Sequence, residues 1–171
     1  MDKRWIVIFI ILIVGISSLY FITDESMKIG KAITTIENVI VTLPTDFRVN
    51  ADHETSVELI NRNTDAKILV ELIGQKNKAH QLMKNDLQEL KNENVINIKN
   101  NTQNISNITT YTISYQNLSS DSPVNYTVNY INKLNKTFII STYDYNDNVS
   151  QMKDLTEIIN TLRLDFKQKD R

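Results

Sequence analysis

The chain has 171 residues, and its 19 Lys and Arg against 20 Asp and Glu give a net charge of −1 at pH 7. This balance provides no basic surface of the kind that nucleic acid requires, so nucleic acid is not an expected partner. The sequence contains no cysteine, which excludes disulfides, thiolate catalysis and cysteine-based zinc sites.

The first expected element is a membrane-spanning helix over residues 5–23. This stretch, WIVIFIILIVGISSLYFIT, has no charged residue, and as a helix it would span about 28 Å, close to the thickness of the bilayer hydrocarbon. Lys3 and Arg4 precede it, which predicts a cytoplasmic N-terminus and an external domain in a single-pass cell-membrane protein. The alternative is a signal peptide cleaved after the small residues Gly15 and Ser17, which would leave the domain secreted.

The rest of the chain divides into a connector, one domain and a short tail. We expect a polar linker at residues 24–35 with at most one turn of helix. A single folded domain should occupy residues 36–166, because this length suits one hydrophobic core. Residues 167–171 form a charged tail.

Strands are expected in the first half of the domain. Residues 38–43 form a β-branched run that Pro44 ends. Alternation of apolar and polar residues predicts the strands that follow, at 47–54, 55–61 and 66–73. Residues 68–70 (Ile-Leu-Val) are uniformly apolar, which predicts a central strand covered on both faces.

A helix should follow, because the apolar period changes after Gly74. The residues on one helical stripe are Ala79, Leu82, Met83, Leu87 and Leu90. This spacing predicts an amphipathic helix that packs on the sheet, with Asn77 as its N-cap.

The second half of the domain returns to strands and ends in a helix. A short strand at 94–99 should lead into a polar loop at 100–107. Three longer strands then form an antiparallel meander, around Tyr111–Tyr115, Val124–Tyr130 and Thr137–Tyr143. The first two of these alternate apolar residues with hydroxyl or amide residues, which predicts a thinly covered polar sheet face. Residues 148–164 have helical spacing, with Asn148 and Gln151 as a capping box.

The opening of the domain, Ile40-Val41-Thr42-Leu43-Pro44-Thr45-Asp46-Phe47, resembles the start of the PsbP-like family. Members often have Gly and Trp where this chain has Asp46 and Phe47. Residues 155–166 are similar to the final helix of the family, and the resemblance covers about residues 36–166. It implies an α+β fold in which helices flank an antiparallel sheet as an α/β/α sandwich, in exported or membrane-tethered accessory domains.

Candidate catalytic and metal-binding residues are few. His53 and His80 are the two histidines of the chain, and a site would need both of them together with a carboxylate. Residues 144–155 begin like a calcium-binding loop, but Val149 replaces the required Gly and Leu155 the required Glu. Nucleophile and phosphate-binding motifs are absent from the sequence. We therefore expect no catalysis, no metal and no cofactor.

Seven N-x-[ST] sequons follow the expected amphipathic helix. They begin at Asn100, Asn104, Asn107, Asn117, Asn125, Asn135 and Asn148. An exported domain would make such sites available for glycosylation. We expect the better acceptors in loops or turns, at Asn104, Asn107, Asn117 and Asn135.

Three hypotheses for function follow. The leading one is a membrane-anchored external accessory or binding domain that acts through contacts with a protein partner. The second is a carrier of a small apolar ligand, in a cavity lined by Leu82, Met83, Leu87 and Tyr126. The third is a hydrolase with an unfamiliar site around His53 or His80.

Overall fold

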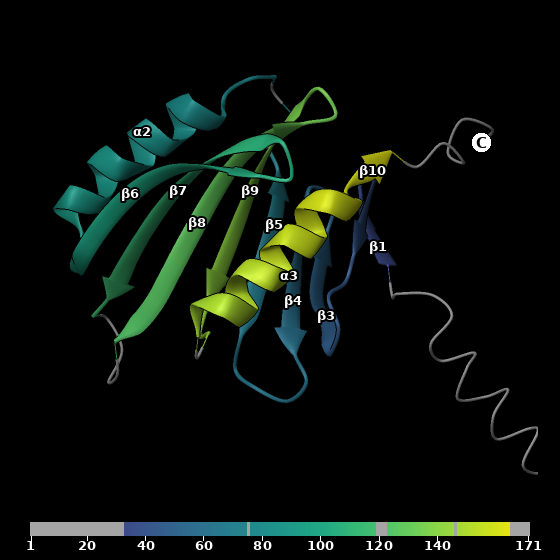
Figure 1. Ribbon diagram of the computed structural model, residues 1–171, viewed down its shortest axis with the longest axis horizontal. Helices are drawn as coiled ribbons and strands as arrows, with labels where there is room; N and C mark the ends of the chain where they lie inside the picture. Colours follow the sequence, from purple (N-terminus) through teal and green to yellow (C-terminus); the bar gives the residue numbers. More distant parts are fainter. Residues whose placement is uncertain (1–32, 75, 119–122, 146, 165–171) are drawn as a thin grey trace, which may run out of the picture. The chain divides into compact units, whose positions relative to one another are not determined.

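The computed structural model describes residues 33–74, 76–118, 123–145 and 147–164 (Figure 1). The expected membrane segment at 5–23, most of the expected linker and the tail at 167–171 lie outside these residues. Within the described ranges, neither α-helix is long and apolar enough to cross a bilayer.

Seven antiparallel strands form the main sheet, in the order β3-β4-β5-β9-β8-β7-β6. Their bounds are β3 (Phe47–His53), β4 (Ser56–Asn61), β5 (Lys67–Leu72), β6 (Val95–Ile105), β7 (Ile108–Asn117), β8 (Val124–Lys133) and β9 (Lys136–Tyr143). Strand β7 pairs with β8, and β8 pairs with β9. The α+β class and the predicted antiparallel meander are therefore confirmed.

A smaller antiparallel sheet has the order β1-β2-β10, with β1 (Ile33–Ile36), β2 (Val39–Thr42) and β10 (Arg163–Leu164). Strand β1 lies where the linker was expected to continue to residue 35. The prediction was wrong there, because the β-branched run Ile-Thr-Thr-Ile pairs with β2 and buries Ile36 completely.

Two α-helices, α2 (Ala79–Glu89) and α3 (Asn148–Thr161), and the 3-10 turn η1 (Leu90–Asn92) complete the described residues. Both expected caps were wrong. Asn77 has a left-handed backbone with φ 54°, so it lies in the turn before α2. Asp147, rather than Asn148, caps α3, and its carboxylate accepts a hydrogen bond from the Ser150 backbone N–H at 2.7 Å.

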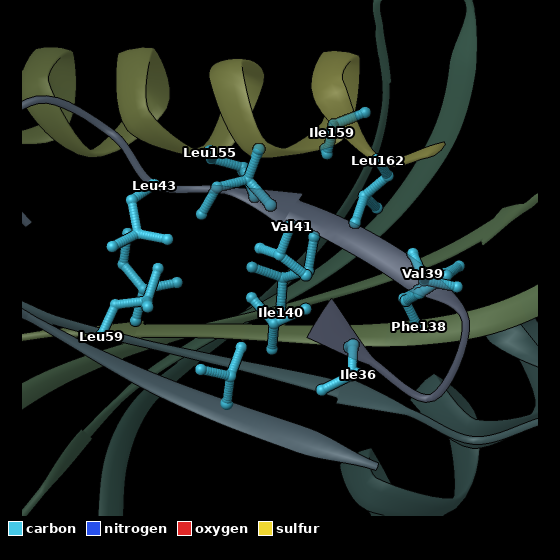
Figure 2. Close-up of a cluster of buried hydrophobic side chains, with 14 of the residues drawn as sticks. Ile36, Val39, Val41, Leu43, Leu59, Phe138, Ile140, Leu155, Ile159 and Leu162 are labelled. Carbon is cyan, nitrogen blue, oxygen red and sulfur yellow. The ribbon is translucent and has the colours of Figure 1, made fainter. Parts of the chain in front are cut away.

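The main core lies between one face of the large sheet and a layer made of α3 and the small sheet. Figure 1 shows α3 crossing in front of β5 and β4. In Figure 2, Leu155, Ile159 and Leu162 of the α3 region point toward Val39 and Val41 of β2. All five side chains are at most 2% exposed.

The opposite face of the large sheet is covered only in part. Helix α2 packs on β7, β8 and β9, where Met83 belongs to a second apolar cluster with Ile113 and Tyr130. Residues 68–70 are therefore not covered on both faces as predicted. Ile68 is fully buried, whereas Leu69 on the other face is only half-buried. The sandwich is complete on one face and open over part of the other.

The prediction of a polar loop at residues 100–107 was also wrong, because residues 100–105 belong to strand β6. Residues Lys99–Ile105 pair continuously with β7, and β6 forms the edge of the sheet. An edge strand with exposed side chains needs no apolar alternation, because its backbone pairing supplies the structure. Asn-rich composition therefore concealed this strand.

Candidate functional site

The antiparallel register aligns side chains in rows across the sheet face that α2 partly covers. One row contains Arg48, Ile60, Lys67, Tyr143, Tyr126 and Tyr115. The next contains Glu58, Leu69, Ser141, Val128 and Ile113. A third contains Ser56, Glu71, Ile139, Tyr130 and Tyr111.

Helix α2 lies over the Ile113 and Tyr130 end of these rows. The remaining part, which we call the open face, consists of Glu58, Lys67, Leu69, Glu71, Ser141, Tyr143, Tyr126 and Tyr115. Every one of these side chains is half-buried, whereas Ile68, Val70 and Ile140 on the other face of the same strands are 0% exposed. The described residues thus leave the open face uncovered.

Three stacked tyrosine rings form the centre of the open face. The ring centroids of Tyr115 and Tyr126 are 5.3 Å apart and nearly parallel, and those of Tyr126 and Tyr143 are 5.2 Å apart. The Lys67 ammonium lies 5.6 Å from the centroid of the Tyr143 ring. Each aromatic pair adds about 0.5–1.5 kcal/mol beyond its buried area. The three rings therefore form one stacked row.

Burial changes the titration of several groups on this side of the sheet. Partial burial raises the pKa of Glu71, and the nearby Asp86 carboxylate raises it further. The Tyr130 hydroxyl donates to Asp86 Oδ2 at 2.6 Å, and burial together with this bond raises the Tyr130 pKa well above its usual value. Burial raises the Tyr143 pKa to about 12. Tyr130 and Tyr143 thus present neutral hydroxyls at neutral pH.

The open face presents three half-buried aromatic rings. Half-buried rings supply apolar area with little loss of side-chain entropy on binding, and their hydroxyls can form hydrogen bonds at the edge of a contact. Lys67 and Glu58 add charges of both signs. Among proteins in general, Tyr is enriched at interfaces.

The two histidines lie on different elements. His53 is exposed at the end of β3, and His80 is exposed on α2, where its ring stacks on Tyr111 with 4.8 Å between centroids. In the described part of the chain, no group of three or more His, Asp or Glu side chains is placed to hold a metal ion. His53 lines a surface hollow with Glu37, Asp52 and Glu54, whereas His80 lies outside it, so the two histidines are not brought together.

The residues expected to line an apolar cavity do not lie together. Leu82, Met83 and Leu87 pack into the cluster around Ile113 and Tyr130. Tyr126 instead stacks between its two neighbours on the open face. Three hollows of the described surface are lined largely by polar residues, and none includes the three α2 side chains. The geometry gives the carrier hypothesis no support.

The four preferred sequons have different surroundings. Asn107 and Asn135 lie in turns between strands and are exposed, as expected. Asn104 is exposed but lies within β6 rather than in a loop, and Asn117 is the half-buried last residue of β7. Glycosylation stays a prediction, and Asn107 and Asn135 are the two of the four that are both exposed and in turns.

Sequence reasoning did not identify the open face as a unit. The alternation of tyrosines in β7 and β8 was visible, and Tyr126 was singled out for a different reason. Which tyrosines lie side by side depends on strand register, and a shift of one residue would send them to opposite faces.

No family model matches the chain, and no curated protein matches it in sequence. Several solved structures are similar in fold. A crystal structure from Bacteroides thetaiotaomicron VPI-5482 has a TM-score of 0.58 and 14% identity, over 79% of this chain and 48% of the other. The solution structure of cyanobacterial PsbP from Synechocystis sp. PCC 6803 has a TM-score of 0.49 and 11% identity, over 79% of this chain and 91% of the other.

A third similar structure is LpqN, involved in cell envelope biogenesis of Mycobacterium tuberculosis, with a TM-score of 0.47 and 11% identity, over 77% of this chain and 84% of LpqN. The chain spans about half the length of the Bacteroides protein. A PsbP is thus among the structures of similar fold. At these identities the likeness concerns the fold alone.

Proposed function

We propose that this chain is a binding domain that acts through contacts with another protein and that the open face is its contact surface. The single observation that carries this proposal is the row of stacked tyrosines on an uncovered part of a well-packed sheet. A domain that needed only to fold would gain by covering Leu69, Tyr126 and Tyr143, because burying apolar area is worth about 25 cal/mol per Å². Uncovered apolar and aromatic surface is typical of an interaction site.

We further propose that the domain acts outside the cytoplasm, held by residues 5–23 in the membrane. The support is the uncharged segment of bilayer length with Lys3 and Arg4 before it. A tether confines the domain to the membrane surface, where a weak contact with a neighbouring protein is strengthened by the high local concentration.

The proposed contact can be tested by photo-crosslinking of the full chain in its native membranes. A photoreactive residue in place of Ser141, between Leu69 and Val128 in its row, should crosslink one partner specifically. The matched control carries the same residue at Thr109, which is exposed at the start of β7.

A second variant decides whether the crosslink depends on the open face. Leu69→Lys adds a charge to the face without filling or emptying the fully buried core. The crosslink from position 141 should be lost, while the thermal unfolding transition is retained. Crosslinks of equal yield from positions 141 and 109, or a crosslink that survives Leu69→Lys, would contradict the proposed surface.

A further inference from the structure

A polar groove lies on the other face of the sheet, beside the first turns of α3. Its floor is formed by Ser114 and Gln116 of β7 and by Asn125 and Thr127 of β8, and Tyr145 and Gln151 contribute to its wall. The groove has a volume of about 560 Å³, within the range of roughly 300–1,000 Å³ that is usual for small-ligand sites. This is the polar sheet face predicted from the alternation in residues 110–115 and 124–130.

Cross-strand pairs of polar side chains build the floor of the groove. Gln116 Nε2 donates to Asn125 Oδ1 at 2.9 Å, and the hydroxyls of Ser114 and Thr127 are 3.3 Å apart. Asn97 Nδ2 donates to Gln116 Oε1 at 2.6 Å and extends the row to β6. The amides of the floor are thus oriented by one another.

The same network continues into the interior of the domain. Gln151 Nε2 on α3 donates to Thr142 Oγ1 at 2.5 Å, and Thr142 in turn donates to the Thr127 carbonyl at 3.2 Å. Below the floor, Thr112 donates to the fully buried Asn129 at 3.0 Å. For stability alone, apolar residues would serve these buried positions as well or better, because the net gain from a satisfied buried hydrogen bond is small. The network instead fixes where the groove amides point.

Two polar atoms of the groove have no hydrogen-bond partner among the described residues. The Asn125 Nδ2 and Asn97 Oδ1 atoms form no hydrogen bond within that part of the chain. The charges of the lining are one of each sign, Lys99 and Asp147. The groove therefore offers both donors and acceptors without a strong net field.

We propose that this groove binds a short neutral oligosaccharide. Sugar hydroxyls donate and accept at once, and side-chain amides complement them in both senses. A charged ligand would find no cluster of opposite charge in the lining. An extended peptide would need apolar pockets for alternate side chains, whereas the side chains of Ser114, Gln116, Asn125 and Thr127 in the floor are amides and hydroxyls.

The test is a titration of the isotope-labelled full chain in micelles of a detergent without a sugar headgroup. The probes are maltotriose, cellotriose and triacetylchitotriose, each to about 10 mM, which detects dissociation constants in the millimolar range. At least one probe should give saturable shifts of the side-chain amide signals of Gln116, Asn125 and Gln151.

Two variants and one control locate the binding. Asn125→Leu and Gln151→Met remove groove amides with little change of volume, and each should weaken binding about three- to tenfold. Asn100→Leu replaces an exposed asparagine of β6 that aligns with Ile113 on the other face, and it should leave the affinity unchanged. Retained backbone spectra show that the variants are folded. No shift with any probe, or equal affinities for the groove variants and the control, would overturn the proposal.

Discussion

At the scale of single residues, the environment of Tyr143 decides when it titrates. Burial raises the pKa of the Tyr143 phenol from 10.0 to about 12, and the nearby Glu58 carboxylate is the second cause of this increase. The unfolded chain therefore releases this proton at lower pH than the folded domain does. The free energy of unfolding should fall as the pH rises from about 10 to about 12 and should be unaffected by this group below pH 10.

This effect can be isolated by comparing the wild type with Tyr143→Phe. The variant keeps the ring stack with Tyr126 but lacks the titrating hydroxyl. Its unfolding temperature should decrease less steeply than that of the wild type between pH 10 and pH 12. Parallel pH profiles for the two proteins would show that Tyr143 is not the protected phenol.

Asp147 is a second residue whose local contact sets its role. Its carboxylate accepts the Ser150 backbone N–H, and this bond lowers the pKa of Asp147. Asp147→Ala should lower the unfolding temperature at pH 7 measurably, because a helix N-terminal donor loses its acceptor. Asn148→Ala, one residue later, is the matched control and should have little effect in the same melting experiment. The reverse order of the two effects would restore Asn148 as the cap.

At the scale of elements, α3 stabilises the domain through one face. Leu155 is 1% exposed and Val149 is 80% exposed on the same helix. Leu155→Ala should lower the free energy of unfolding by about 2–5 kcal/mol, because it leaves a cavity between α3 and the sheet. Val149→Ala should change it by at most about 0.5 kcal/mol. Denaturant unfolding of both variants measures the difference, and similar losses would mean that α3 does not pack as described.

Helices and strands were predicted correctly where apolar side chains recur at a regular spacing. They were missed where backbone pairing alone defines the strand. The alternation in β7, β8 and β9 predicted three strands, and the 3.6-residue spacing predicted both helices. Strand β6 was missed over most of its length because its exposed edge side chains show no period, although Lys99–Ile105 pair fully with β7. Strand β1 was missed because a four-residue run is too short to give a pattern by itself.

At the scale of the whole molecule, the location of the domain remains a prediction from residues 5–23. Protease added to intact cells should digest the domain at residues 36–166, because it would lie on the outer side of the membrane. A tag at the N-terminus should be protected in the same cells. Survival of the domain until the cells are lysed would contradict the proposed topology, whatever the open face binds.

The two proposed sites lie on opposite faces of the same sheet. Neighbouring residues of β7 and β8 point to opposite faces, so Tyr115 and Tyr126 belong to the open face while Gln116 and Asn125 form the groove. Tyr115 and Tyr126 also contribute to the lining of the groove, whereas Leu69 and Ser141 do not, so the Leu69→Lys variant tests the contact surface without changing the groove.

The sequence by itself determined the class of fold, the meander, both helices and the polar side of β7 and β8, because these depend on the period of side chains along one segment. Tertiary structure alone decided that α2 covers only one end of the sheet and that three tyrosines from β7, β8 and β9 stack in one row. Both outcomes depend on strand register and on where a helix docks. These are relations between distant segments, and no local pattern specifies them.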